Sequence, residues 1–167
     1  MVLAVLSATA CGITHPQDLS FRVDTRLHFT TPNARAQVQQ PVTVAWTMRD
    51  FAIVAPGSGA PHRNAGYFAI FIDRAPIKPG QSIRAVASGD RVCLHDPKCP
   101  DETYLNQRGI VTTTATTIQL PTLHNISGSK ESIQTHTITV VLLDASGDRI
   151  GESAWQCDVR LRKTAFG

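Results

Sequence analysis

Residues 136–161 consist of two runs rich in β-branched and apolar residues, separated by the short turn Ala145-Ser-Gly-Asp148. Such a pattern predicts a β-hairpin formed by residues 136–144 and 149–161. In the second run apolar residues alternate with polar ones, at Trp155, Cys157, Val159 and Leu161. Successive side chains of a strand point to opposite faces, so this alternation predicts one face in a core and one in water.

Further segments earlier in the chain also have strand character, either by alternation or as a continuous apolar run: residues 21–29, 41–48, 66–73, 110–113 and 116–120. The segment 56–66 is rich in Gly and Pro and predicts a surface loop. A chain of 167 residues suits one domain. Short strands separated by turn signals, with Trp46 on an early core-facing strand, favour an all-β fold. We therefore expect a single antiparallel β-sandwich over residues 21–163.

The regular spacing of strands is interrupted between residues 74 and 109, which we interpret as an insertion. Residues 82–87 are expected to form a short strand. Pro100 suits a first helical position, Asp101 and Glu102 a first turn, and Arg108 a last turn followed by Gly109. The insertion is therefore predicted to contain one short helix of two turns.

Composition and motifs argue against several classes of function. The net charge is +3 without any cluster of Lys and Arg, and aromatic residues make up 6% of the chain, so nucleic acid is a poor partner. Ser58 lies in Pro56-Gly-Ser-Gly59, which lacks the spacing of a nucleophile elbow, and the phosphate and dinucleotide fingerprints are absent. Asp101 and Glu102 are explained by the helix dipole. We predict a protein that is not an enzyme and needs no cofactor.

The first residues carry a different signal. Small and apolar residues lead into Leu6-Ser-Ala-Thr-Ala-Cys11, which resembles the cleavage end of a bacterial lipoprotein signal peptide. The resemblance implies that residues 1–10 are the remnant of the signal, that the Cys11 thiol carries lipid, and that residues 11–20 are a tether. It also implies an extracytoplasmic domain anchored to a bacterial membrane by its N-terminal lipid. The alternative is an ordinary apolar start with a plain thiol at Cys11.

The C-terminal part also resembles a known class of domain. Residues 117–123, followed by a loop, the strand-like His136-Thr-Ile-Thr-Val140 and the turn Asp144-Ala-Ser-Gly147, are similar to the end of bacterial immunoglobulin-like and fibronectin type III-like domains. The resemblance covers residues 117–161 and implies a fold rather than a function. We expect an Ig-like β-sandwich with the insertion at residues 74–109.

The remaining cysteines allow two interpretations. In an oxidising envelope, Cys93 and Cys99 are expected to form a disulfide that staples the insertion. The alternative is a copper or zinc site made by Cys93, His95 and Cys99 with Asp96, although the chain offers no second ligand pair. Cys157, on the core face of the last strand, is expected to be a small buried apolar residue, unless it pairs with a distant cysteine.

These observations predict a non-catalytic lipoprotein that binds another envelope component, such as a membrane protein complex of which it is an accessory subunit. Long ordered insertions usually carry function, so the insertion is the expected contact surface. Its candidate partner-contact residues are His95, Asp96, Asp101, Tyr104 and Arg108. The alternative function is a copper- or zinc-handling envelope protein that uses the loop with Cys93, His95 and Cys99.

Overall fold

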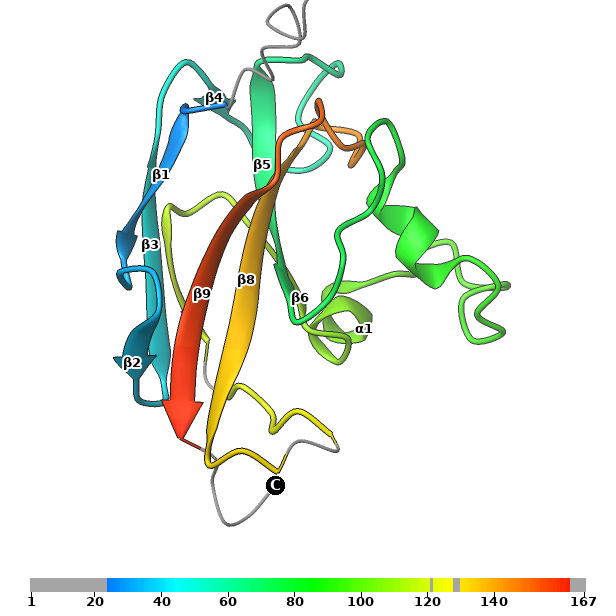
Figure 1. Ribbon diagram of the computed structural model, residues 1–167. Helices are drawn as coiled ribbons and strands as arrows, with labels where there is room; N and C mark the ends of the chain where they lie inside the picture. The colour runs from blue at the N-terminus through cyan, green and yellow to red at the C-terminus, as the bar shows by residue number, and fades with distance from the viewer. Residues whose placement is uncertain (1–23, 121, 128–129, 163–167) are drawn as a thin grey trace, which may run out of the picture.

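The computed structural model describes residues 24–120, 122–127 and 130–162 (Figure 1). Most of these residues lie in or between strands, and the helical elements are one short α-helix and one 3₁₀-helix. The elements in chain order are β1 (Leu27–Thr31), β2 (Ala36–Val38), β3 (Val42–Met48), β4 (Ala52–Ile53), β5 (Ala65–Ile72), η2 (Ile83–Ala87), α1 (Glu102–Asn106), β6 (Ile110–Thr113), β7 (Thr117–Leu120), β8 (Ile133–Leu143) and β9 (Trp155–Arg162).

The strands form two sheets. The smaller is antiparallel, with the order β1-β3-β7. The larger has the order β2-β9-β8-β5-β4, with β6 also paired to β5. The short pairs β2–β9 and β4–β5 are parallel, so the larger sheet is mixed, and the expected antiparallel arrangement holds only for the other pairs.

The two sheets share the main core, called here the inner core. Phe68 and Trp46 lie at its centre with their rings edge to face and their centroids 5.2 Å apart, a favourable aromatic geometry. The inner core contains the alternating residues of the C-terminal hairpin and of β3, as predicted. Its buried members are Leu27, Val42, Val44, Trp46, Phe68, Ile70, Leu120, Leu123, Ile138, Val140, Leu142, Cys157, Val159 and Leu161.

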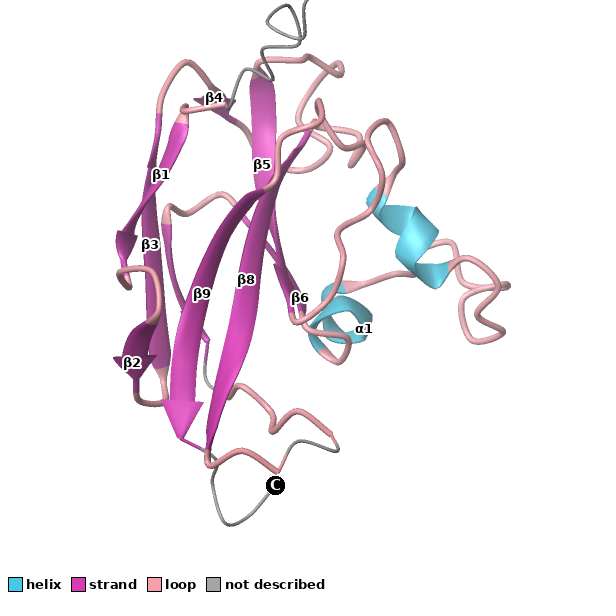
Figure 2. Cartoon of the chain, viewed as in Figure 1, coloured by secondary structure: helices cyan, strands magenta, loops and turns pink. Residues whose placement is uncertain are grey.

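A second group of buried residues, the outer core, lies on the opposite face of the larger sheet. There the insertion packs over β5 and β8, so its helices lie on the side of that sheet away from β1 and β3 (Figure 2). The continuous apolar run of residues 66–73 is thereby explained, because β5 is covered on both faces as predicted. The outer core consists of Tyr67, Ala69, Phe71, Ile77, Leu105, Ile110, Val141 and Leu143.

Some predicted elements differ from those observed. The strand expected at residues 82–87 is wrong: these residues form η2, because the Ser82 Oγ accepts a hydrogen bond from Arg84 N and begins a helical turn. The helix predicted from Pro100 is present but shorter, since Asp101 is its N-cap rather than a first-turn residue. The last strand begins at Trp155 rather than at Arg149, so the hairpin connection is longer than expected.

Candidate functional site

The insertion is joined to the larger sheet by backbone hydrogen bonds to the β8–β9 connection. Arg149 N donates to Gln81 O (2.9 Å), and its carbonyl accepts from Gly80 N (3.1 Å). Ile83 N donates to Gly147 O (2.8 Å). Gly147 has a φ of +89°, and a Cβ there would lie 3.2 Å from the Ile83 side chain, so this junction requires glycine.

The Arg149 side chain reinforces this junction. It is 7% exposed, and its guanidinium donates to the carbonyls of Ile77, Glu152 (2.9 Å) and Ser153 (3.2 Å). Burial lowers the pKa of Arg149, and its Nε has no partner among the described residues. A buried cation held by carbonyl oxygens fixes the start of the insertion to the loop before β9.

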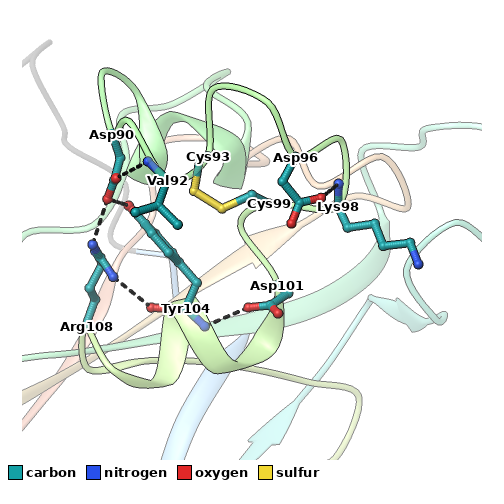
Figure 3. Close-up of a disulfide and its surroundings, with 9 residues drawn as sticks. All are labelled: Asp90, Val92, Cys93, Asp96, Lys98, Cys99, Asp101, Tyr104 and Arg108. Carbon is teal, nitrogen blue, oxygen red and sulfur yellow. Dashed lines mark hydrogen bonds and ion pairs between the residues drawn. A yellow bond between two sulfur atoms is a disulfide. The ribbon is translucent and has the colours of Figure 1, made fainter.

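Three polar side chains form the base of the outermost loop of the insertion. The Tyr104 hydroxyl donates to Asp90 Oδ2 (2.7 Å), and Arg108 Nη2 lies 2.8 Å from the same oxygen (Figure 3). The Arg108 guanidinium also lies over the Tyr104 ring, 3.5 Å from its centroid. The Tyr104 hydroxyl is the main cause of a lowered pKa of Asp90, and the same bond raises the pKa of Tyr104.

Above this base, the loop is closed by a disulfide between Cys93 and Cys99, whose Cα atoms are 5.2 Å apart. The predicted disulfide is therefore present (Figure 3). Asp90 Oδ1 accepts from Val92 N (2.9 Å) and Asp96 Oδ1 from Lys98 N (2.8 Å), so carboxylates also cap the turns on either side. Residues 91–99, called here the stapled tip, are held by one covalent link and by local hydrogen bonds.

The stapled tip carries two exposed apolar side chains. Val92 is 78% exposed and Leu94 65%, more than the exposed Ile53 (42%) and Ile126 (39%). Neither Val92 nor Leu94 was identified from the sequence. The available signal was two aliphatic residues inside a segment otherwise made of charged, His, Cys and Pro residues. Neither strand nor helix periodicity requires apolar residues at these two positions.

The structure separates the residues predicted to contact a partner. Tyr104 is buried, and Arg108 is half-buried against it, so both are parts of the base. His95, Asp96 and Asp101 are exposed, the first two on the stapled tip and the third at the start of α1, where its Oδ1 accepts from Tyr104 N (2.8 Å). Their contact with a partner stays a prediction.

The other two cysteines have different outcomes. Cys157 is a free, buried thiol, as expected for a small core residue, and burial raises its pKa. Cys11 lies outside the described residues, as do residues 1–20 that were interpreted as signal remnant and tether.

The alternative metal site would need the thiolates of Cys93 and Cys99 as ligands. Cys93 and Cys99 are joined to each other, so neither offers a thiolate in this state. Within residues 24–120, 122–127 and 130–162, no three or more His, Cys, Asp or Glu side chains come together in a group that could hold a metal ion.

A groove of about 870 Å³ lies between α1 and residues 122–126. Its apolar lining residues include Ile72, Val111, Leu120 and Leu123, and Asp73 also lines it. Asp73 Oδ2 is 2.7 Å from Nδ1 of His136, a buried histidine on β8. The groove was not predicted, because it forms where the ends of β5 and β7 meet the insertion, and no local pattern signals such a meeting.

The comparisons with known proteins do not assign a family. No family model matches this chain, and neither a curated protein nor a solved structure matches it significantly. Among the described residues, no helix has the length and apolar character needed to cross a lipid bilayer.

Proposed function

We propose that this chain is a lipoprotein anchored through Cys11 outside the cytoplasm, and that its domain binds another component of a bacterial envelope without catalysing a reaction. The domain is proposed to be an Ig-like β-sandwich that carries a specialised insertion. The observation that carries the proposal is the stapled insertion, which a sandwich does not need in order to close its inner core.

The insertion is well suited to contact another molecule. Its inner side is fixed to the larger sheet through the outer core and Arg149, while its outer side exposes charged and apolar side chains. A surface that is already ordered loses little conformational freedom on binding, which favours affinity. Asp101 is exposed at the start of α1, and it is the residue of the insertion that we propose to contact a protein partner.

The anchor is tested by mass spectrometry of the protein extracted from the membranes of its native host. We expect a chain that begins at Cys11 and carries acyl groups on that residue. An unmodified Cys11 that still follows residues 1–10 would contradict the anchor and the location together.

The protein contact is tested by placing a photo-reactive amino acid at position 101 in cells, with the same residue at position 53 as a control. Ile53 is also exposed but lies on β4, away from the insertion. We expect a cross-linked product of defined mass from position 101 and none from position 53. Free protein at both positions would argue against a partner at the insertion.

A further inference from the structure

We propose that the stapled tip, residues 91–99, contacts the headgroup region of an anionic lipid bilayer. This inference rests on the proposed attachment to a membrane and divides the insertion into two surfaces. The tip lies on lipid, and the start of α1 is left for a protein partner at the membrane surface.

The apolar part of the contact is supplied by Val92 and Leu94. They are the two most exposed large hydrophobic residues of the described chain. Both belong to residues 91–99, and this stretch forms the loop farthest from the two sheets in Figure 1. Exposed apolar groups of this kind mark contacts with proteins or membranes.

The charges around these two residues favour an anionic surface. Arg91 and Lys98 are exposed on either side of them, and neither side chain forms a hydrogen bond or ion pair with another residue of the described ranges. Asp90, next to Arg91, forms an ion pair with Arg108 and accepts a hydrogen bond from the Tyr104 hydroxyl in the base. Asp96 is the exposed carboxylate within residues 91–99, so the two cations leave the tip with a net positive charge. Long cationic side chains place their charge at headgroup level while their stems remain in apolar surroundings.

The staple explains how so short a segment can present apolar residues to lipid. The disulfide and the carboxylate caps hold Val92 and Leu94 outward, so that they do not fold back onto the domain. The tip contains no Phe, Trp or Tyr. Protein interfaces concentrate their binding energy in Trp, Tyr and Arg, and of these the tip contains only Arg91. Two aliphatic side chains between cations fit the shallow insertion of a loop into a bilayer better.

The anchor leaves enough chain for this orientation. An extended chain from Cys11 to Asp24 spans at most about 45 Å. A tether of this length lets the domain turn relative to the membrane that holds the lipid.

Binding to vesicles tests the tip without the anchor. The full chain with Cys11→Ser and an intact disulfide is sedimented with vesicles of phosphatidylglycerol and phosphatidylcholine in equal parts, and with vesicles of phosphatidylcholine alone. We expect binding to the anionic vesicles that weakens as salt is added. Arg91→Gln and Lys98→Gln should each weaken it about five-fold, the effect of one cation at an anionic surface. Val92→Ser with Leu94→Ser should weaken it about ten-fold or more.

Ile53→Ser is the matched control, since it removes an exposed aliphatic residue far from the tip and should leave binding unchanged. Leu94→Trp gives a second measurement: its fluorescence should shift to the blue on anionic vesicles, and that of Ile53→Trp should not. Absence of binding, or binding that the tip variants do not change, would overturn the inference and would instead favour a protein as the partner of the tip. Acylated Cys11 without tip binding would leave the proposed function intact and overturn only this inference. Tip binding by a chain whose Cys11 is unmodified in its native host would support this inference and contradict the proposed anchor and location.

Discussion

The two faces of β5 are buried by different means. On the inner face, strands of two sheets contribute alternating apolar residues to one continuous core. On the outer face, loops and two short helices cover the strand, and they are held by backbone hydrogen bonds, by buried Arg149 and by a disulfide. The inner face depends on apolar area, whereas the outer face combines a smaller apolar area with specific polar links.

This difference suggests a division of roles between stability and presentation. The inner core is made of regular strands, and its residues are buried between the two sheets, where they cannot contact a partner. The outer layer is made of loops and short helices. It exposes a loop whose conformation is fixed by the hydrogen bonds among Asp90, Tyr104 and Arg108 at its base. Binding residues are commonly found on such loops over a rigid scaffold.

The largest effect is expected from truncation of the inner face. Phe68 is fully buried against Trp46, so Phe68→Ala should lower the free energy of unfolding by about 3–5 kcal/mol through lost apolar contact and an unfilled cavity. Urea unfolding followed by tryptophan fluorescence measures it. Ile53→Ala, at an exposed site, should change stability by less than about 0.5 kcal/mol. A similarly small loss for Phe68→Ala would show that the inner face does not dominate.

Truncation of the outer face should have a smaller and more local effect. Leu105 on α1 is 5% exposed and packs in the outer core, so Leu105→Ala should destabilise by about 2–3 kcal/mol. Hydrogen exchange should accelerate mainly in residues 80–109, because the insertion can open while the two sheets stay paired. Equal acceleration throughout β8 would mean that the two faces unfold as one unit.

Removal of the staple should have a still smaller effect. Cys93→Ser with Cys99→Ser should lower the free energy of unfolding by about 2 kcal/mol, since the disulfide closes a short loop. Exchange should increase most in residues 91–99. A loss larger than that of Phe68→Ala would indicate that the staple supports the inner core as well as the tip.

The smallest expected effect is the loss of stability in acid that Asp24 causes. The hydrogen-bonded ion pair with Arg26 lowers the pKa of Asp24 from 3.8 to about 2, and Ser153 also donates to this carboxylate. A lowered pKa stabilises the fold at pH above the ordinary value, and this contribution is lost as the pH falls from 3.8 towards 2. Asp24→Asn should therefore cost about 1 kcal/mol near neutral pH, allowing for partial exposure, and almost nothing at about pH 2.

Urea unfolding of both proteins across this pH range measures the difference. A gap between them that stays constant down to about pH 2 would mean that the charge of Asp24 is not what stabilises the fold. Asp90 in the insertion also has a lowered pKa, so acid weakens a polar link in each region.

The sequence predicted the inner face better than the outer one. Alternation on β9 and a continuous apolar run on β5 follow from strand geometry, and both were interpreted correctly. The helix in the insertion and the Cys93–Cys99 disulfide were also predicted, because capping residues and cysteine spacing are local signals. Residues 82–87 were misassigned, since a β-branched start and three apolar residues suit a strand as well as a 3₁₀-helix.

What could not be predicted depends on residues far apart in the chain. Asp90 meets Tyr104 across 14 positions, and Arg149 meets Ile77 across 72. The stacking of Arg108 on Tyr104 could have been predicted, because residues four apart are neighbours on a helix and the helix expected from the sequence extended to Arg108. The burial of Tyr104 in the base could be seen only in the fold.

The buried guanidinium of Arg149 bears on any attempt to shorten this protein. Excising residues 74–109 would uncover an aromatic and aliphatic strip along β5 and take away one of the three carbonyls that hold the cation. The shortened chain would then need replacements at Tyr67, Phe71 and Arg149 in order to stay soluble and paired. The insertion is therefore a structural part of the domain and cannot simply be deleted.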